Sequence, residues 1–476
     1  MFLVHSEVEV RESLTITRKY LKVLSVTFLI LFAGVFLLSS TFVNADQAVT
    51  IGRIWGSSMA LDSAGNIALT GDTASFGNGQ SLALLFKFDP SGRRLCFRTW
   101  GPQNYPANGG SGSDDTFGYG VAFDSSNNMY WTGTTMAETH EDYDVFLVKY
   151  DSSCNQVYWV GWGAQGNDIG RAVATDASDN VYVTGSTSSY GSGQGFTTSD
   201  IFLLKYGPSG ESQWSRTWGG LQNDYGTGVT VDSAGNVYVA GSTNSYGGQS
   251  DFVLLKYDPS GNLLFQKVWG GAQNDFGTGV AVDAGGNAYL TGYTYSFGST
   301  PGVASAILVK YDPSGNPLFQ ETWGGSQNTF GYGVTVDGAG NAYVTGYTYG
   351  SHPASAVATT FLLKYDPSGN LLSQQTWGGN KGDYAYAVAV DNVGNVFVTG
   401  YTYSFGPNTK GANFFILKYD AFGNLLYQLT YGGGIPLTDL YAVNGGGVPV
   451  PEFSGLAIAA VSALAASLYV LRRRRK

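Results

Sequence analysis

Carboxylates recur within one short motif of this 476-residue chain and could bind a cation. The motif reads W-G-G-x-Q-N-D-[YF]-G, and a run of small and β-branched residues follows it. Its acidic positions are Asp168, Asp224, Asp275 and Asp383, with Asp115 in an expanded copy. Carboxylates suit Ca²⁺ and also accept hydrogen bonds from a polyhydroxy ligand. The alternative is that each side chain hydrogen-bonds its own loop, as Asn and Asp commonly do.

Catalytic constellations have little support. Histidine occurs only at His5, His140 and His352, which are far apart along the chain, so neither a Ser-His-Asp triad nor a histidine-rich metal site is indicated. We therefore name no catalytic residue and favour a non-enzymatic protein. The alternative is an extracellular enzyme that acts on polysaccharide with paired acids such as Asp168 and Asp224.

Aromatic residues are set among Gly and Ser in several predicted loops. They are Tyr190, Tyr246, Tyr295, Phe297, Tyr349, Tyr403 and Phe405. Recognition loops use such rings because they supply contact area at a low cost in conformational entropy. We predict that Tyr246, Tyr295 and Tyr403 contact a glycan or protein ligand together with the junction aspartates. The alternative is a set of solubilising linkers with incidental aromatics.

Two turn signatures predict the elements that position these residues. One has the pattern D-x-x-G-N and begins at Asp62, Asp124, Asp176, Asp232, Asp283, Asp337 and Asp391. The other follows Lys and an aromatic residue, at Asp89, Asp151, Gly207, Asp258, Asp312, Asp366 and Asp420. Asp caps such a turn, Pro sets φ, and Gly supplies the positive φ of a bulge, so each signature joins two antiparallel strands. Four strands in about 54 residues form a propeller blade. The prediction is an all-β, seven-bladed β-propeller over residues 46–433.

Spacing divides the propeller into scaffold and loops. Nine residues separate the first-turn Asp from the Gly that ends the second strand, and thirteen separate the third-strand Lys from the closing aromatic, in all seven repeats. Length variation falls mainly in the loops between second and third strands, which emerge opposite the tight turns, so we expect function on that face. The repeats resemble the SBBP β-propeller repeat family, which implies this fold but no particular activity. Since the first blade begins near Trp55 and the seventh ends near Tyr431, ring closure requires no strand exchange.

The two ends of the chain predict export. Residues 1–45 carry basic residues before an apolar run, as a signal peptide does, and residues 434–450 form a linker. Residues 451–476 contain an apolar run long enough for a transmembrane helix and end in five cations. This tail, with Pro451-Glu452-Phe453 at its start, resembles the PEF-type sorting signals of archaeal surface proteins. The resemblance implies an archaeosortase-like processing enzyme and a lipid anchor; a plain transmembrane anchor is the alternative.

Charge and cysteine content limit the kinds of binding partner and the role of the cysteines. Without residues 1–45 and 472–476 the chain retains 16 basic and 32 acidic residues, which disfavours nucleic acid. The two cysteines, Cys96 and Cys154, are too few for a disulfide scaffold, and we expect them to be packing residues rather than a pair. The resulting hypothesis is an exported, membrane-anchored propeller on the cell surface that binds a ligand or mediates adhesion through its loop face. A purely structural envelope component is a further alternative.

Overall fold

Four-stranded antiparallel sheets make up the described chain, as the paired turn signatures predict. The computed structural model describes residues 54–73, 81–101, 115–136, 142–192, 196–349, 357–406 and 411–432, all within a unit that spans Val49–Ile435. The predicted signal peptide, linker and sorting signal lie outside the described residues. Within those ranges no helix is long and apolar enough to cross a membrane.

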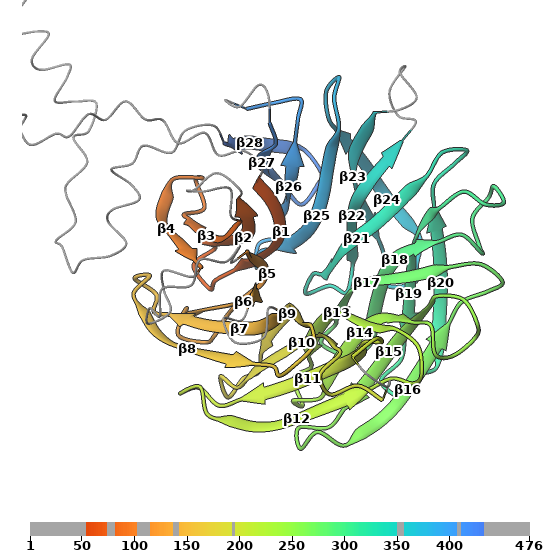
Figure 1. Ribbon diagram of the computed structural model, residues 1–476. Coiled ribbons are helices and arrows are strands. Elements are labelled where there is room, and N and C mark those ends of the chain that lie inside the picture. Colours follow the sequence, from red (N-terminus) through yellow and green to blue (C-terminus); the bar gives the residue numbers. More distant parts are fainter. Residues whose placement is uncertain are drawn as a thin grey trace, which may run out of the picture. The chain divides into compact units, whose positions relative to one another are not determined.

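Each blade is formed by four consecutive strands of the chain, and the blades are arranged around a common centre (Figure 1). Blades 1 to 4 contain β1 (Ile54–Leu61), β2 (Ile67–Thr73), β3 (Leu82–Phe88), β4 (Arg94–Trp100); β5 (Thr116–Phe123), β6 (Met129–Met136), β7 (Tyr143–Tyr150), β8 (Gln156–Trp162); β9 (Asp168–Thr175), β10 (Val181–Thr187), β11 (Asp200–Tyr206), β12 (Ser212–Trp218); and β13 (Asp224–Val231), β14 (Val237–Thr243), β15 (Asp251–Tyr257), β16 (Leu263–Trp269). Blades 5 to 7 contain β17 (Asp275–Val282), β18 (Ala288–Thr294), β19 (Ser305–Tyr311), β20 (Pro317–Trp323); β21 (Thr329–Val336), β22 (Ala342–Tyr349), β23 (Ala358–Tyr365), β24 (Leu371–Trp377); and β25 (Asp383–Val390), β26 (Val396–Thr402), β27 (Asn413–Tyr419), β28 (Leu425–Tyr431). The first strand of each blade is innermost (Figure 1). The predicted seven-bladed propeller is confirmed.

Tight turns join the first strand to the second and the third to the outer strand in every blade. In the turn at Asp258, the N–H of Gly261 donates to the carbonyl of Asp258 at 2.9 Å, and Gly261 has a φ of 81°. Oδ1 of Asp258 accepts hydrogen bonds from the N–H groups of Ser260 and Asn262, both at 2.9 Å. The other thirteen turns repeat this backbone bond. The predicted capped turn with a positive-φ bulge residue is therefore confirmed.

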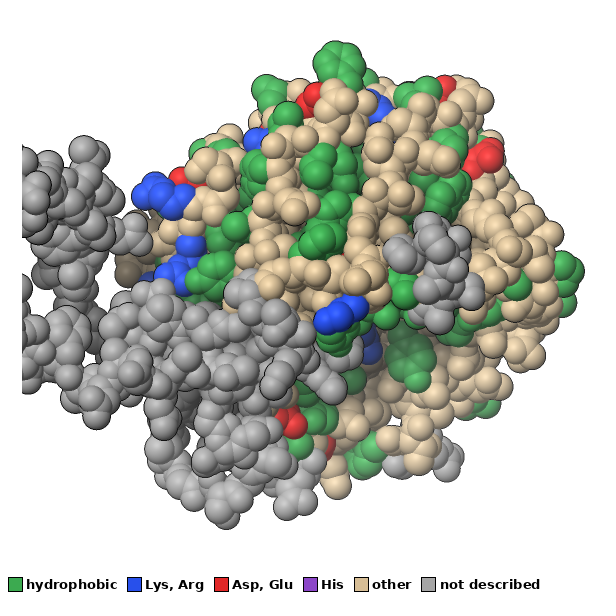
Figure 2. Space-filling view, turned by 90° about the horizontal axis from the view of Figure 1, so that it is seen from above, with side chains coloured by type: hydrophobic (Ala, Val, Ile, Leu, Met, Phe, Trp, Pro, Cys, Tyr) green, Lys and Arg blue, Asp and Glu red, His purple; other side chains and the backbone are tan. Residues whose placement is uncertain are grey.

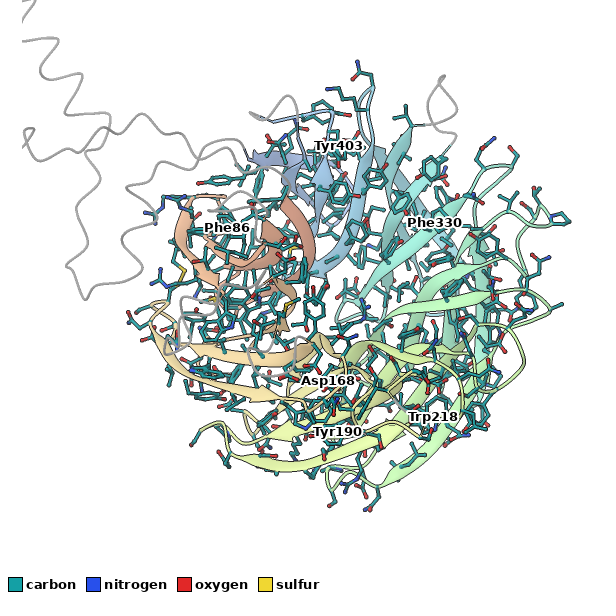
Figure 3. All side chains as sticks on the ribbon, in the orientation of Figure 1. Phe86, Asp168, Tyr190, Trp218, Phe330 and Tyr403 are labelled. Atoms are coloured by element: carbon teal, nitrogen blue, oxygen red, sulfur yellow. A yellow bond between two sulfur atoms is a disulfide. The ribbon has the colours of Figure 1, made fainter. Side chains whose placement is uncertain are left out.

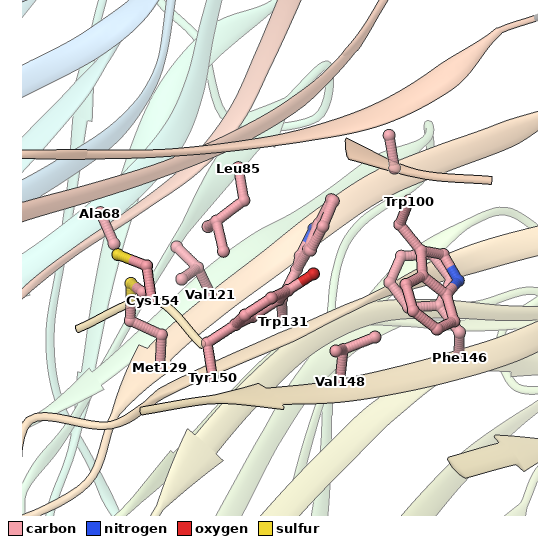
Figure 4. Close-up of a cluster of buried hydrophobic side chains, with 11 residues drawn as sticks. Ala68, Leu85, Trp100, Val121, Met129, Trp131, Phe146, Val148, Tyr150 and Cys154 are labelled. Carbon is pink, nitrogen blue, oxygen red and sulfur yellow. The ribbon is translucent and has the colours of Figure 1, made fainter. Parts of the chain in front are cut away.

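The core of the ring lies between neighbouring blades. Figure 4 shows the cluster between blades 1 and 2, which consists of Ala68, Ala83, Leu85, Trp100, Val121, Met129, Trp131, Phe146, Val148, Tyr150 and Cys154. Trp100 and Trp131 have no exposed surface, and their ring centroids lie 5.9 Å and 5.5 Å from that of Phe146. Comparable clusters fill the following junctions. Apolar burial between blades thus stabilises the ring.

Ring closure depends on side-chain packing between blades 1 and 7. Within the described residues no strand is exchanged between the two ends, as predicted. The ring of Phe86 lies 5.0 Å from that of Phe414 and 5.4 Å from that of Tyr431. The Arg94 guanidinium donates a hydrogen bond to the Tyr431 hydroxyl. Aromatic contacts therefore take the place of a shared strand.

A lysine on each third strand connects neighbouring blades. The ammonium group of Lys310 donates to the carbonyl of Pro367, in the outer turn of the next blade, at 2.9 Å. The same Nζ lies 4.0 Å from Oδ2 of Asp283 and 4.6 Å from the ring centroid of Tyr289. Equivalent bonds from the third-strand lysine to the next blade's outer turn recur in blades 1 to 6.

The two cysteines form a disulfide, so their prediction as unpaired packing residues is wrong. Cys96 on β4 and Cys154 in the β7–β8 turn are joined across the junction of blades 1 and 2, with Cα atoms 6.6 Å apart. Cys154 occupies the turn position that is glycine in the other six outer turns, and it has a φ of 67°. A cysteine that accepts a left-handed backbone in place of glycine was the overlooked signal.

The outer edge of the ring repeats one apolar feature. Leu264, Leu318, Leu372 and Leu426 share one register on their outer strands, and each is about half exposed. Figure 2 shows one side of the molecule, where hydrophobic side chains form patches among polar ones and charged side chains are sparse. Because neighbouring blades repeat this feature, it does not mark one specific site.

Candidate functional site

Two sets of loops meet on the face opposite the tight turns. The loop after each second strand contacts the junction that leads into the first strand of the same blade. The N–H of Asn244 donates to the carbonyl of Asn223 at 2.9 Å, and that of Tyr295 donates to the carbonyl of Asn274 at 3.1 Å. These bonds assemble one loop face, where all the predicted ligand-binding residues are located.

The junction aspartates Asp168, Asp224, Asp275 and Asp383 begin the first strands of blades 3, 4, 5 and 7, and all have no exposed surface. Figure 3 shows the position of Asp168 in the ring. Oδ2 of Asp383 accepts hydrogen bonds from the N–H of Gly379 and the hydroxyl of Ser404, both at 2.8 Å, while Thr402 donates to Oδ1. Each of these four carboxylates is covered by its own loops, and its predicted role in binding a cation or polyhydroxy ligand stays a prediction. The pair Asp168 and Asp224, suggested for an enzyme, is therefore buried.

Asp115 occupies a different register from the other four. Its Oδ1 accepts a hydrogen bond from the N–H of Ser81 at 2.6 Å, as Oδ1 of Asn223 does from Ser199 at 3.0 Å. Asp115 is therefore equivalent to the Asn of the motif, and Thr116 opens β5 in place of the buried Asp. The neighbouring Asp114 lies outside the described residues.

Burial raises the pKa of several loop-face carboxyl groups. It raises the pKa of Asp168 and of Asp383 above the usual range, against hydrogen bonds that lower it. Burial, followed by the nearby Asp275 carboxylate, raises the pKa of Asp251 to about 6. Asp251 begins β15 and was not among the predicted residues.

The loop aromatics fall into two classes with different roles. Tyr190, Tyr246, Phe297 and Phe405 pack on the closing tryptophans Trp162, Trp218, Trp269 and Trp377, with ring centroids 4.7–5.2 Å apart. The predicted ligand contact Tyr246 therefore covers Trp218, although its ring remains 39% exposed. Figure 3 labels Tyr190 and Trp218, which both belong to blade 3.

The second class belongs to a continuous cluster on blades 5 to 7. This cluster, the aromatic arc, consists of Phe276, Tyr293, Tyr295, Phe330, Tyr332, Tyr347, Tyr349, Tyr384, Tyr386, Tyr401 and Tyr403. The predicted residues Tyr295 and Tyr403 are part of it. Figure 3 labels two members, Phe330 and Tyr403, on blades 6 and 7.

Neighbouring rings of the arc are in contact within and between blades. The ring centroid of Tyr293 lies 5.0 Å from that of Phe276 in its own blade and 4.9 Å from that of Phe330 in the next. Tyr347 continues the chain, at 5.2 Å from Phe330 and 4.8 Å from Tyr384. The rings lie at the loop ends of the two innermost strands, and all but Tyr401 are partly exposed.

The fold does not require these tyrosines. The second-strand register of Tyr293, Tyr347 and Tyr401 is occupied in blades 2, 3 and 4 by Thr134, Ser186 and Ser242, with the same strand pairing. Likewise, Asn244 in blade 4 stands where blades 5 and 7 have Tyr295 and Tyr403. The second-strand and loop tyrosines of the arc are therefore a local departure from the repeat, whereas its first-strand registers are also aromatic at Phe117 and Tyr119 in blade 2 and at Tyr225 in blade 4. Only Tyr295, Tyr349 and Tyr403 stood out as loop residues; aligning the repeats would have revealed the others.

An open cleft adjoins the end of the arc on blades 4 and 5. It has a volume of about 560 Å³ and is lined by Gln249, Ala272, Gln273, Asn274, Phe276, Tyr293 and Tyr295. This volume is within the range of small-molecule sites. The lining of the cleft thus combines exposed amides with aromatic rings.

Burial raises the pKa of several arc hydroxyl groups. It raises the pKa of Tyr293 and Tyr332 to about 12 each and that of Tyr347 above the usual range. Near neutral pH these phenols are therefore hydrogen-bond donors and acceptors without charge. The arc is suited to binding an uncharged polar ligand.

Blades 1 to 3 carry charged side chains on the loop face that do not follow the repeat pattern. Burial, followed by the Asp115 carboxylate, raises the pKa of Asp72 to about 7. The Arg171 guanidinium carbon lies 5.6 Å from the ring centroid of Tyr119. No sequence signal singled out Asp72, because its burial depends on neighbouring blades.

Among the described residues, no three His, Cys, Asp or Glu side chains gather in a group that could hold a metal ion. His140 and His352 lie outside those residues. Any cation bound by the described part of the chain would need main-chain, hydroxyl or water oxygens besides carboxylates.

Comparison with known proteins supports the repeat assignment. Residues 213–248, 322–352 and 373–406 match the SBBP β-propeller repeat, so the chain carries SBBP repeats. Regulatory protein FlaEY of Caulobacter vibrioides is 29% identical over 56% of this chain and 33% of its own length. The uncharacterized WD repeat-containing protein L264 of Acanthamoeba polyphaga mimivirus is 23% identical over 54% of this chain and 26% of its own. This chain thus spans a third or less of the length of these relatives.

Solved structures show only distant likeness. Sqt1 of Chaetomium thermophilum has a TM-score of 0.46 at 9% identity and covers 81% of this chain and 89% of its own. The β-propeller domain of the Trilobed protease from Pyrococcus furiosus has a TM-score of 0.43 at 8% identity and covers 76% and 93%. Neither similarity bears on function.

Proposed function

We propose that this propeller is a non-enzymatic binding protein whose aromatic arc recognises a glycan. The observation that carries the proposal is the confinement of the arc to blades 5 to 7. The second-strand registers of other blades hold Ser or Thr without any change in strand pairing, so the tyrosines at these positions in blades 5 to 7 are not needed by the scaffold.

The chemistry of the arc favours a glycan. A pyranose ring has an apolar C–H face that packs on an aromatic ring, and hydroxyl groups at its edge that hydrogen-bond to amides and phenols. The cleft offers both, with Phe276, Tyr293 and Tyr295 beside the amides of Gln249 and Gln273. Its lining side chains carry no charge, which favours a neutral sugar over an anionic one. A protein partner is the competing outcome.

We place the protein on the cell surface. The support is the predicted signal peptide and C-terminal tail, together with the Cys96–Cys154 disulfide, since such bonds persist in oxidising compartments. An archaeosortase-like enzyme would remove the tail after about Pro451. Mass spectrometry of the mature protein tests this, and an intact Arg472 would favour a plain transmembrane anchor.

A glycan array probed with the purified full-length protein tests the binding proposal. We expect binding to neutral oligosaccharides, with no change in their length during prolonged incubation. The variant Tyr293→Ser introduces the residue that blades 3 and 4 have in this register, and it should bind about 2- to 10-fold more weakly, because one aromatic contact is worth about 0.5–1.5 kcal/mol. Unchanged affinity of Tyr293→Ser, or cleavage of any bound glycan, contradicts the proposal.

A further inference from the structure

Three successive blade junctions each bring together two aspartates from neighbouring blades, and all of them are buried except Asp144, which is half-buried. The first aspartate lies at or near the start of a third strand, and is Asp144, Asp200 or Asp251. The second begins the first strand of the next blade, and is Asp168, Asp224 or Asp275 respectively. The glycine that follows the closing tryptophan lies beside the first aspartate in each case, and beside both aspartates at Gly163 and Gly219.

The paired carboxylates lie close to one another. A Cβ atom at Gly219 would lie 2.4 Å from Oδ1 of Asp200 and 2.7 Å from Oδ2 of Asp224, so these oxygens are within about 5 Å of each other. A Cβ atom at Gly163 would similarly lie 1.8 Å from Oδ1 of Asp144 and 2.8 Å from Oδ2 of Asp168.

The scaffold does not need the first aspartate. At the junction of blades 6 and 7 its register is held by Thr359, and Asp383 alone retains the hydrogen bonds to Thr402, Ser404 and Gly379. At the junction of blades 5 and 6 both registers are uncharged, with Ser305 and Thr329. Three junctions thus carry an additional carboxylate, buried at Asp200 and Asp251 and half-buried at Asp144, that the fold accepts but does not demand.

At two of these junctions, one oxygen of the additional carboxylate is not compensated by the protein. Oδ2 of Asp200 accepts hydrogen bonds from the N–H and the hydroxyl of Ser192, at 2.7 Å and 3.0 Å. Asp200 and Asp251 are only 3% and 6% exposed, however, and Oδ1 of each is buried without a hydrogen-bond partner among the described residues. Within the same residues no ion pair to Lys or Arg involves either of them. Two like charges buried side by side are strongly unfavourable unless a counter-charge lies between them.

We propose that these three junctions are cation sites, each binding one Ca²⁺ between Asp144 and Asp168, Asp200 and Asp224, or Asp251 and Asp275. The donors are hard oxygens, which favours Ca²⁺ over a thiol- or imidazole-seeking metal. With only two carboxylates per site, we expect weak affinity, in the range of about 10⁻⁴–10⁻³ M that extracellular modules show. The bound ion would tie the third strand of one blade to the first strand of the next.

Equilibrium dialysis of chelator-treated full-length protein against Ca²⁺ tests the proposal by stoichiometry. We expect three ions per chain, two in Asp200→Asn, and none in the triple variant Asp144→Asn, Asp200→Asn, Asp251→Asn. Terbium offers a second readout. Trp162, Trp218 and Trp269 immediately precede the three junction glycines and should sensitise the emission of bound Tb³⁺. In the variants this emission should fall as the number of bound ions falls.

Matched controls come from the uncharged junctions. Thr359→Asn alters the equivalent register where no pair exists, and should leave three ions bound. The double variant Ser305→Asp, Thr329→Asp recreates the pair and should raise the number to four. The proposal is overturned if the wild-type protein binds no Ca²⁺, or if the folded triple variant binds as much as the wild type. In the first case a shared proton compensates the pair, and in the second the ion binds elsewhere.

Discussion

The disulfide between blades 1 and 2 should contribute strongly to stability. It closes a loop with a sequence separation of 58 residues, for which the chain-entropy relation gives about 4 kcal/mol at 25 °C. An unfolding entropy of about 2.1 cal/mol/K per residue, applied to the propeller of residues 46–433, converts this free energy into a Tm difference of about 5 °C. We therefore expect reduction of the wild-type protein to lower Tm by about that amount.

Differential scanning calorimetry with and without a reducing agent measures this difference. Cys96→Ser should melt about 5 °C below the oxidised wild type and should not respond to reductant. Cys154→Gly should lose less, because glycine relieves the positive φ of 67° at that turn, a gain of about 1 kcal/mol. An oxidised wild-type Tm that reductant leaves unchanged would refute the reasoning.

Three further changes test the packing and the electrostatics. Asp72→Asn should remove a pH dependence of stability. The pKa of Asp72 is about 7 in the folded protein and exceeds the ordinary value of 3.8, so the wild type loses stability as the pH rises between these values. Tm measured from pH 4 to pH 8 should therefore fall less in the variant than in the wild type. Asp176→Ala removes an acceptor for the N–H groups of Ser178 and Asn180, at 2.8 Å and 3.0 Å, and should cost about 1–2 kcal/mol in denaturant unfolding. Lys310→Met breaks the 2.9 Å bond to a carbonyl of the next blade and should cost about 1–2 kcal/mol by the same measurement, whereas no loss would show that this bond is dispensable.

The scaffold was predictable because its signals are local and repeated. Each turn signature, such as Asp258 to Asn262, specifies a hairpin through backbone chemistry that needs no distant partner. Seven copies with constant spacing then specify the number of blades and the face on which the loops gather. The same logic missed the disulfide, because Cys154 pairs with a residue of another blade.

The site was harder to predict because burial depends on neighbouring blades. Asp275 lies in an exposed-looking Gly-rich motif, yet its own loops cover it completely. Tyr246 and Tyr295 come from similar loop sequences, but one packs on a closing tryptophan and the other joins the arc, since they stand two positions apart in register. Comparing registers among the seven repeats separates these roles better than composition does.

Titration of the tightest-binding array glycan into matched variants tests the central claim most directly. The triple variant replaces Tyr293, Tyr347 and Tyr401 with Ser, which is the residue of blades 3 and 4 in this register. The control replaces Tyr246 with Ser, because Tyr246 packs on a tryptophan outside the arc. Each aromatic contact is worth about 0.5–1.5 kcal/mol, and only Tyr293 and Tyr347 of the three are partly exposed, since Tyr401 is buried. The triple variant should therefore bind about 5- to 150-fold more weakly by isothermal titration calorimetry, while Tyr246→Ser binds as the wild type does. Equal affinity of the folded triple variant and the wild type would contradict a binding role for the arc.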